Sequence, residues 1–474
     1  MISEEEILKR RDMREAFTFT IDPASAKDFD DAISFVEVDD AHYQIGVHIA
    51  DVTYYVEQDS LTDKLAYEKA TSTYLVDRVI PMLPEELSND LCSLRPGEDK
   101  LCMSIVFTMT HDARVEKYKV CRTVINSDYR LSYEEAQQII DGEMPTLADM
   151  PVGTVVCNNL KRAIKELNLM ALIMRRQRMA KGALDIEQEE LHFSLGETGC
   201  PVDVWFQKPT AANHLIEEWM LLANRTIATH IAKMGKPMVY RVHDKPDEEK
   251  LVSLRKFKRR MGDKIPYATI DMLTIRAMAK AEYSTINIGH YGLQFKYYTH
   301  FTSPIRRYPD MIVHRLVTQY ILGGRVKKNG LDVELAEACE HCSACEQIAV
   351  QAERDSQKEF FCLFLQQHIG EVHQGVITGV TEFGLFVQLK DSHAEGLVPI
   401  RTISPNMYLQ LDEKNYCLRT KASNTKNKRH RGWVSEVEQV DQEKTYMLGD
   451  EVSVRIERAD ADRMQIDFAL MEDA

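Results

Sequence analysis

The sequence predicts an α+β fold, in which a strand-rich region and a helical region are followed by a small all-β barrel. Three observations support it. Strand-like apolar runs dominate to about residue 126, helical patterns follow to about residue 368, and short glycine-containing strands fill the last hundred residues. The chain has 474 residues, 44% of them hydrophobic, which is enough for one large domain and at least one smaller one.

The first region is predicted to be a β-sheet. Tyr43–Ala50, Leu101–Met109 and Lys117–Asn126 are apolar runs of strand length. Before them, Phe17–Ile21 alternates apolar and polar residues as a half-buried strand does. Pro23 follows at once, and because proline cannot continue a central ladder, this strand must end at Asp22.

Helices are predicted from Ser132 onward. Ser132 and Glu135 form a capping box ahead of a helix that Gly142 ends. Pro309 in a first turn and Gly323 past the end delimit a later helix. The long helical patterns cover about 154–181, 210–234, 247–261, 308–322 and 331–368.

The last region is predicted to be a closed or partly open barrel of about five short strands, beginning near Glu371. It is interrupted at 419–443 by a polar, basic stretch without an apolar pattern, which we interpret as a long insertion.

Charge is unevenly distributed along the chain. The net charge is −15, yet basic residues cluster at 175–178, 250–260, 306–307 and 426–431, while acidic residues fill other segments. Such segregation can leave a positive channel inside an acidic shell, although each cluster taken alone could be a solvated helix face. No apolar run approaches membrane-spanning length, the N-terminus lacks a signal-peptide core, and ten scattered cysteines favour reduced thiols. A cytoplasmic protein is expected.

Four aspartates, Asp22, Asp28, Asp30 and Asp31, lie within ten residues between two predicted strands. The repulsion between adjacent carboxylates such as Asp30 and Asp31 costs free energy unless a cation or strong hydrogen-bond donors neutralise it. Oxygen ligands on a loop suit Mg²⁺ or Mn²⁺, which keep waters for a phosphate-bearing substrate. The alternative is a solvated acidic turn.

A second cluster lies at His300–Leu316, where Arg306 and Arg307 precede a helix. Arginine forms forked contacts with phosphate oxygens, and a helix N-terminus adds donors with the same preference. Asp310 and His314 stand one helical turn apart and could orient each other or an arginine. Ordinary capping and ion pairing would explain these residues equally well when they are considered alone.

Three separated segments make the chain recognisable: DPASAKDFDDA at 22–32, HIADV at 48–52 and HYGLQFKYYTHFTSPIRRYPDMIVH at 290–314. They resemble the RNase II/RNase R (RNB) family of exoribonucleases, more closely its RNase R branch. GVITGVTEFGLFV near the C-terminus resembles an S1 domain. The resemblance implies a charged leader at 1–16, an RNB catalytic domain at 17–325 with a mixed sheet or barrel surrounded by helices, its helical extension at 326–368, and an S1-type OB barrel at 369–474.

The resemblance also implies a reaction. Members of the family hydrolyse single-stranded RNA processively from the 3′ end to nucleoside 5′-monophosphates, and structured RNA could be a further substrate. By position, the four aspartates match ligands of Mg²⁺, with two ions expected and Mn²⁺ able to substitute. The catalytic residues implied are Asp28, Asp30 and Arg306, with Asp30 indispensable and Arg306 contacting the scissile phosphate.

RNA contacts are implied at further positions. Tyr74 matches a tyrosine that packs against the 3′-terminal nucleotide, although it could be an ordinary half-buried aromatic, and Glu353 matches a glutamate near the 3′ end. Arg307 is expected to bind RNA beside Arg306. In the S1-like region, exposed aromatics stack on bases, so Phe383 and Phe386 are candidates, one of which is expected in the core.

The chain departs from the family pattern in its first residues. Family members usually carry two cold-shock-type domains ahead of the catalytic domain, whereas about sixteen residues precede it here. A natural short form and an N-terminally truncated fragment with altered substrate range both remain open, and either should have a more open RNA entrance. A non-catalytic RNA-binding member and a phosphodiesterase acting on DNA are two rival hypotheses. A monomer is expected.

Cys339, Cys342 and Cys345 have a spacing found in iron–sulfur ligand runs. They lie in a continuous helical pattern, which spreads them along a stripe, so we predict a structural role. His48 and His314 are likewise predicted to be buried, oriented histidines and not metal ligands.

Overall fold

The computed structural model describes the chain except residues 1, 144–154, 185–188, most of 250–276, 325–329, 404–407, 413–415, 422–443 and 472–474. The helix expected at 247–261 and most of the insertion expected at 419–443 therefore lie outside the described residues.

A seven-stranded mixed sheet forms the centre of the first domain. Its strand order is β1-β8-β7-β4-β3-β2-β9, and all neighbours are antiparallel except β1 with β8 and β2 with β9. On the central strand β4, Ile45, Val47 and Ile49 on one face and His48 on the other are fully buried, so the strand is covered on both faces. The strand bounds are β1 Arg11–Asp12, β2 Thr18–Asp22, β3 Asp31–Asp39, β4 His42–Ala50, β7 Asp99–Thr110, β8 Val115–Asn126 and β9 Tyr129–Ser132.

The strands expected from the sequence are all present, but the expected leader is not separate from the domain. Helix α1 (Glu4–Leu8) leads into β1, which pairs with β8 of the sheet. Nη1 of Arg10 lies 2.8 Å from Oδ2 of Asp51, and both side chains are buried. Residues from about 10 onward are thus part of the first domain, because a buried ion pair and a strand pairing hold them there.

Helices pack around the sheet. The predicted capping box at Ser132 and Glu135 is formed, and Gly142 ends α4 with a φ of 89°, where a side chain would be strained. Trp219 of α6 is the largest fully buried side chain. The helix bounds are α2 Val52–Tyr55, α3 Leu61–Lys69, α4 Tyr133–Asp141, α5 Val155–Ala180, α6 Ala211–Lys233, α9 Tyr308–Tyr320 and α10 Leu331–Gln366, with a π-helical turn at Glu86–Leu91.

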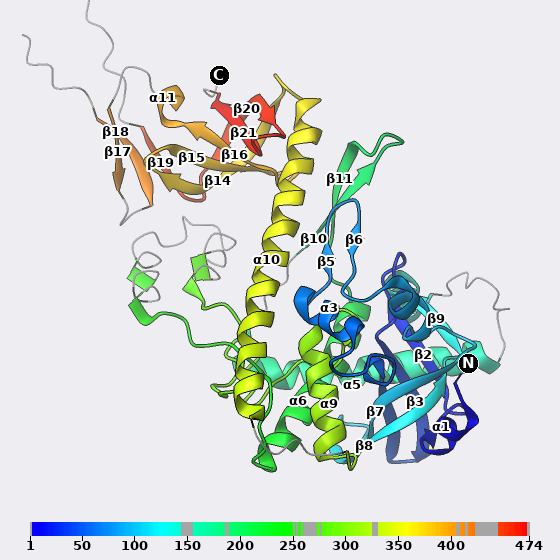
Figure 1. The fold of residues 1–474 in the computed structure, drawn as a ribbon. Helices are drawn as coiled ribbons and strands as arrows, with labels where there is room; N and C mark the ends of the chain where they lie inside the picture. Colours follow the sequence, from blue (N-terminus) through cyan, green and yellow to red (C-terminus); the bar gives the residue numbers. More distant parts are fainter. Residues whose placement is uncertain are drawn as a thin grey trace, which may run out of the picture.

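Three short strand pairs were not expected from the sequence. They are β5 (Thr73–Tyr74) with β6 (Val79–Ile80), β10 (Glu190–Leu195) with β11 (Pro201–Gln207), and β12 (Tyr240–Val242) with β13 (Glu282–Ser284). Both β5 and β11 contact α10, and Figure 1 shows these hairpins beside that long helix.

The C-terminal domain is a closed five-stranded barrel, as expected. Its strands are β14 (Val372–Thr381), β15 (Gly384–Leu389), β16 (Glu395–Pro399), β20 (Glu451–Asp460) and β21 (Gln465–Leu470). Inserted between β16 and β20 are α11 (Ile400–Ile403) and a separate sheet of β17 (Tyr408–Asp412), β18 (Cys417–Lys421) and β19 (Thr445–Met447).

Helix α10 connects the two domains (Figure 1). It packs against β5, β11 and β13 of the first domain and against β20 of the barrel. At its end, Nε2 of Gln366 donates to the carbonyl of Ala459 at 3.2 Å. Across the part of the chain that the structure describes, none of the helices combines the length and apolar character needed to cross a membrane.

Candidate active site

The loop that carries the aspartates is held by hydrogen bonds from three other segments. Oγ of Ser93 accepts from the backbone N–H of Phe29 at 3.0 Å and donates to the carbonyl of Lys27 at 2.7 Å. Nη2 of Arg130 donates to the carbonyl of Pro23 at 2.7 Å. The backbone N–H of Ala50 donates to the carbonyl of Asp30 at 2.9 Å. The aspartates therefore sit on a fixed loop and not on a mobile turn.

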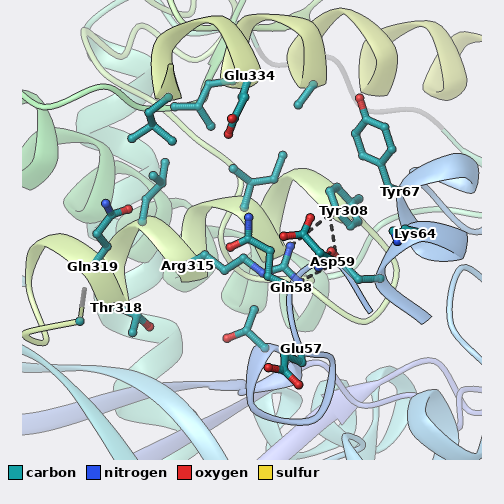
Figure 2. Close-up of a pocket in the computed structure, with 18 of the residues that line it drawn as sticks. Glu57, Gln58, Asp59, Lys64, Tyr67, Tyr308, Arg315, Thr318, Gln319 and Glu334 are labelled. Atoms are coloured by element: carbon teal, nitrogen blue, oxygen red, sulfur yellow. Dashed lines mark hydrogen bonds and ion pairs between the residues drawn. The ribbon is translucent and has the colours of Figure 1, made fainter. Parts of the chain in front are cut away.

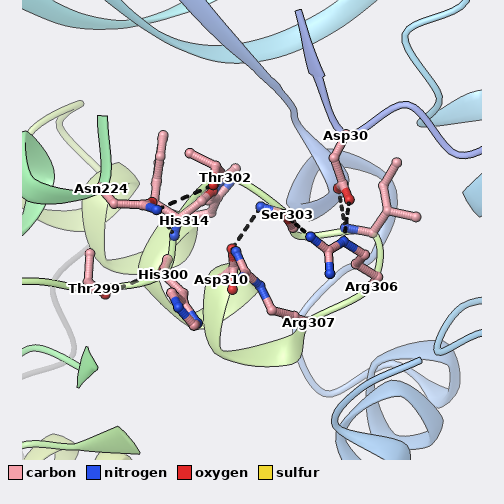
Figure 3. A network of polar contacts seen from close by, with 12 residues as sticks. Asp30, Asn224, Thr299, His300, Thr302, Ser303, Arg306, Arg307, Asp310 and His314 are labelled. Atoms are coloured by element: carbon pink, nitrogen blue, oxygen red, sulfur yellow. Dashed lines mark hydrogen bonds and ion pairs between the residues drawn. The ribbon is translucent and has the colours of Figure 1, made fainter. Parts of the chain in front are cut away.

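Asp30 is the most enclosed of the four carboxylates. Its Oδ1 accepts a hydrogen bond from the backbone N–H of Ile305 at 2.8 Å, and Nε of Arg306 lies 3.6 Å from Oδ2 (Figure 3). Burial nevertheless raises the pKa of Asp30 well above its ordinary value, and the Arg306 charge offsets this only in part. Negative charge on Asp30 is thus incompletely compensated by the protein.

The three neighbouring carboxylates share this property. Burial raises the pKa of Asp22 and of Asp31, and repulsion from Asp31 raises that of Asp22 further. Burial also raises the pKa of Asp28. Oδ2 of Asp22 is buried and has no hydrogen-bond partner among the described residues. The burial of Asp30, the unpartnered Oδ2 of Asp22 and the raised pKa values favour a poorly hydrated cluster over the alternative of a solvated acidic turn.

The donor set fits a hard divalent cation. Among the described residues, no three histidine, cysteine, aspartate or glutamate side chains already converge on one point as a metal cage. Mg²⁺ does not require one, because it is commonly held by one or two carboxylates, waters and substrate phosphate. The unpartnered Oδ2 of Asp22 and the raised pKa values are what such an ion would relieve.

Arg306 and Arg307 point to different partners (Figure 3). Arg306 faces Asp30, its side chain is 42% exposed, and its Nη2 donates to Oγ of Ser303 at 3.1 Å. Arg307 donates from Nη2 to Oδ1 of Asp310 at 2.7 Å, and the Asp310 side chain is fully buried. Arg306 presents its charge directly to Asp30, whereas Arg307 is engaged by Asp310, although its charge still acts on Asp31.

Of the two possibilities for Asp310 and His314, that they orient each other or an arginine, the structure shows the second, because Asp310 binds Arg307. Oδ1 of Asp310 accepts from the backbone N–H of Ser303 at 2.8 Å, and Nε2 of the buried His314 lies 2.8 Å from the carbonyl of Phe301. Each side chain therefore fixes the turn that leads to Arg306.

Helix α9 is tied down on its far side as well. The hydroxyl of Tyr308 donates to Oδ1 of Asp63 at 2.9 Å, and Nη2 of Arg315 lies 2.6 Å from the same oxygen. Tyr308 and Arg315 line a cavity of about 780 Å³ between α9, α10 and the α2–α3 region (Figure 2). The helix that follows Arg306 thus cannot shift without breaking a buried ion pair.

Tyr74 is attached to the Arg306 segment through the backbone. The N–H of Ser72 donates to the carbonyl of Arg306 at 3.0 Å, and Oγ1 of Thr71 donates to the same oxygen at 3.2 Å. Tyr74 is 40% exposed, and burial of its hydroxyl raises its pKa to about 12. The charges that act on it include those of Arg306 and Asp30. The structure thus brings the predicted tyrosine, arginine and aspartate together.

Glu353 is placed near this hairpin by α10. The backbone N–H of Val76 donates to Oγ of Ser356 at 3.2 Å, which joins the β5–β6 hairpin to the helix. Glu353 lies one turn before Ser356 and is half-buried, and burial raises its pKa.

Tyr133 is a further residue at this site that was not expected from the sequence. Burial raises the pKa of Tyr133, and the negative charges of Asp31 and Asp22 raise it further, so its hydroxyl lies close to the carboxylates. Tyr133 directly follows the capping residue Ser132. The sequence predicted the cap of this helix, but not which way the first turn of the helix faces. No local signal in the sequence distinguishes it from other tyrosines at helix starts.

In the barrel, the two candidate phenylalanines differ in exposure. Phe383, at the turn between β14 and β15, is 67% exposed. Phe386 is half-buried and covers Gly379, where an added Cβ would lie 3.2 Å from the ring. The expectation that one of them is in the core is wrong, since neither belongs to the buried cluster of the barrel.

The remaining sequence candidates are structural. Cys339 and Cys342 lie on α10 and are buried in the core of the first domain. All ten cysteines are free thiols and form no disulfide. His48 is fully buried, with Nδ1 2.7 Å from Oγ of Ser104 and Nε2 2.8 Å from Oγ of Ser34. Its role as an oriented core histidine is confirmed.

Comparison with known proteins decides the family. Residues 10–323 match the RNB domain, and residues 366–470 match the S1 RNA binding domain. The chain belongs to the RNB family. The RNB match begins at residue 10, in agreement with the placement of Arg10 and β1 in the sheet.

Relatives of this RNB-family chain are ribonucleases R. It is 37% identical to ribonuclease R of Aquifex aeolicus and 36% identical to that of Thermotoga maritima, over 99% and 100% of its own length. It spans 66% of the length of each of these relatives. Among solved structures, RNase R of Mycoplasma genitalium in complex with ribose-methylated single-stranded RNA matches with a TM-score of 0.87 at 25% identity, over 99% of this chain and 73% of that one.

Proposed function

We propose that this RNB-family chain is a processive 3′-to-5′ exoribonuclease, a hydrolase that cleaves the terminal phosphodiester of single-stranded RNA and releases nucleoside 5′-monophosphates. The observation that carries the proposal is that the segments bearing Asp30, Arg306 and Tyr74 are joined to one another. The N–H of Ile305 binds the Asp30 carboxylate, and the N–H of Ser72, two residues before Tyr74, binds the carbonyl of Arg306. The ribonuclease R relatives and the RNA-bound structural neighbour support the same activity.

Each of these residues has a distinct task. Arg306 places a permanent, partly exposed charge where a phosphate would approach, and preorganised charge of this kind stabilises the negative charge that develops in the transition state. Tyr74 stacks on the terminal base irrespective of its identity, which suits a sequence-tolerant enzyme. The N–H of Ile305 keeps the Asp30 carboxylate oriented while RNA advances.

The four aspartates are proposed to hold two Mg²⁺ ions, with Mn²⁺ able to replace them. When bound, such ions would supply an activated water and neutralise the leaving 3′-oxygen. The contribution of the chain is to keep Asp22, Asp28, Asp30 and Asp31 poorly hydrated, so that their charges are better satisfied by a cation than by the protein. No side-chain nucleophile is required.

RNA contacts extend beyond these residues in the proposal. Glu353 lies near the 3′ end beside the Tyr74 hairpin, and Phe383 and the half-buried Phe386 offer rings for stacking on the S1 barrel. Arg307 is better assigned to positioning than to RNA binding, because its guanidinium is engaged by the buried Asp310.

The proposal is tested with 5′-labelled single-stranded RNA and Mg²⁺. The label should pass from full-length RNA to a short limit product without accumulation of intermediate lengths, with nucleoside 5′-monophosphate as the other product, and EDTA should stop the reaction. Cleavage from the 5′ end, or internal cleavage, would contradict the assignment. Activity that persists after complete metal removal would contradict the part played by the carboxylates.

Two rival functions differ from the proposal in measurable ways. A non-catalytic RNA-binding member would bind the labelled RNA without shortening it, but the retention of all four carboxylates argues against it. A phosphodiesterase that acts on DNA would continue through a 2′-deoxy terminus, whereas an RNA-specific enzyme that reads the 2′-hydroxyl would stop there.

Structured RNA is proposed as a further substrate, and a duplex with a 3′ overhang tests it. A monomer in the cytoplasm is also proposed. The ten free thiols fit a reducing compartment. Light scattering of the purified chain would reveal a dimer if the monomer is wrong.

A further inference from the structure

A second hollow, of about 750 Å³, lies at the opposite end of the sheet from Asp30. Strands β4 and β7 run from one site to the other. At one end, Ala50, which binds the Asp30 loop, pairs with Cys102, and at the other end His42 pairs with Thr110, which lies beside the hollow. Eight residues at about 3.3 Å each separate Cys102 from Thr110, which places the hollow about 26 Å from the carboxylates. We call it the basic pocket; it is formed by the β7–β8 turn, the end of α5, the middle of α6 and residues 293–297.

The basic pocket concentrates positive charge in a chain whose net charge is −15. Two acidic residues line it, and both are engaged: Glu218 accepts from Nε of Arg178 at 3.0 Å, and Asp112 accepts from the hydroxyl of Thr110. The basic residues that line it are Arg114, Arg178, Lys181, Arg225, Lys233 and Lys296. Arg178 is paired with Glu217 and Glu218, and Arg114 with Glu116, so the excess positive charge of the pocket comes from the other four.

Arg225 is the least satisfied of these cations. Its guanidinium lies over the ring of Phe295, 5.2 Å from the centroid, and within the described part of the chain no carboxylate lies at ion-pair distance from it. Burial lowers its pKa, and the attraction of Glu218, already bound by Arg178, only partly offsets this. A half-buried guanidinium without an anion is a costly arrangement unless a ligand supplies one.

We propose that the basic pocket binds a phosphate-bearing small molecule of the nucleoside 5′-phosphate class. Arg225 would form a forked contact with the phosphate, and Lys181 and Lys233, both exposed, would add charge. Phe295 and Tyr297 supply ring surface for the organic part, and the volume is typical of small-molecule sites. Because the charges surround one hollow, they suit a compact anion better than an extended chain. The site does not depend on the exonuclease reaction.

The other large cavity, behind α9, lacks this character. Figure 2 shows acidic side chains such as Glu57 and Glu334 around it, and five acidic residues against three basic ones line it. Its Arg315 is already paired with Asp63. The charge imbalance, and not the presence of a cavity, is what points to an anion at the basic pocket.

The test is calorimetric titration of the full chain in EDTA with AMP, adenosine and inorganic phosphate. AMP should bind saturably, adenosine should not bind detectably, and phosphate should compete with AMP. Arg225→Gln and Lys181→Gln should each weaken AMP binding, Arg225→Gln by at least about tenfold. Lys181 is exposed, so its substitution separates a binding effect from misfolding.

Two control variants locate the binding. Arg306→Gln should leave the affinity for AMP unchanged, because Arg306 belongs to the candidate active site. Arg162→Gln removes an exposed arginine paired with Glu37 and should also have no effect. Equal AMP affinity in wild type and Arg225→Gln, loss of affinity in Arg306→Gln, or no saturable binding at millimolar AMP would each overturn the proposal.

Discussion

Arg306 places its Nε 3.6 Å from Oδ2 of Asp30, and the residue before it donates its backbone N–H to the other oxygen of the same carboxylate at 2.8 Å. Ile305, which makes that second contact, is 1% exposed. The relative position of the cation and the carboxylate is therefore fixed by chain packing, and not by side-chain conformation alone. This arrangement determines which substitutions should affect chemistry and which should affect folding.

Asp30→Asn should abolish hydrolysis while leaving RNA affinity nearly unchanged. The amide oxygen can still accept from Ile305, but the negative charge needed to hold a cation is lost. Because burial raises the pKa of Asp30, removing the charge should not lower the melting temperature of the metal-free protein. A time course on 5′-labelled RNA, fluorescence anisotropy and thermal melting measure the three quantities. Asp39→Asn, on the exposed end of β3, is the control, and full activity in Asp30→Asn would refute the assignment.

Arg306→Gln should reduce kcat by about 10²- to 10³-fold, the range found when a preorganised charge is removed from a transition state. The melting temperature should change little, because the side chain is 42% exposed and its ion pair with Asp30 is loose. Single-turnover kinetics on RNA separate this loss of rate from a loss of binding. An unchanged kcat with a raised KM would mean that Arg306 only binds RNA.

Arg307→Gln should act on stability instead. It leaves the buried carboxylate of Asp310 without its cation, which typically costs about 3 to 5 kcal/mol. Urea denaturation should therefore show a large loss for Arg307→Gln and a small one for Arg306→Gln. The opposite order would place Arg307, and not Arg306, at the exposed position.

The contrast between these two neighbours marks what the sequence could predict. The strands, the capped helix and the aspartate loop were predictable because their signals are local: apolar alternation, a capping box and a proline. Which of Arg306 and Arg307 faces the carboxylates depends on how the turn at Ser303 and the start of α9 pack. The residues next to the two arginines in the sequence do not indicate which arginine faces the carboxylates.

Tyr133 and the first residues of the chain illustrate the same limit. Tyr133 reaches Asp22 and Asp31 because β9 pairs in parallel with β2, a long-range pairing without a local signature. Arg10 looked like part of a charged leader, and only its buried contact with Asp51 places it in the domain. Charged residues are usually exposed, so sequence reasoning assigns them to the surface unless their partner is known.

Tyr74→Ala should weaken binding of the RNA 3′ end by about 1 to 3 kcal/mol, the value of one base–aromatic stack. Tyr74→Phe should retain affinity, because the proposed contribution comes from the ring and not from the hydroxyl. Anisotropy with a 5′-labelled oligonucleotide, whose 3′ end stays free, in a catalytically inactive background measures both. Tyr54→Ala, which removes another exposed tyrosine, is the control. Equal losses in Tyr74→Ala and Tyr74→Phe would assign the effect to the hydroxyl.

His48 should make the protein sensitive to mild acid. Its ring is enclosed between Ser104 and Ser34, and burial lowers its pKa to about 3, whereas a histidine in the unfolded chain titrates near about 6.5. Below about pH 6.5 the unfolded state therefore takes up a proton that the folded state does not.

The free energy of unfolding should consequently fall with decreasing pH by about 1.4 kcal/mol per pH unit from this residue, down to about pH 3, with no contribution above about pH 6.5. Urea denaturation between about pH 6 and about pH 4 gives the free energy of unfolding against pH for the wild type and for His48→Gln. Both proteins contain the same carboxylates, so the difference between the two slopes comes from His48. His48→Gln should lower the free energy of unfolding at neutral pH. Its free energy of unfolding should nevertheless fall less steeply with decreasing pH than that of the wild type. Equal slopes in the wild type and in His48→Gln would mean that His48 becomes protonated without unfolding.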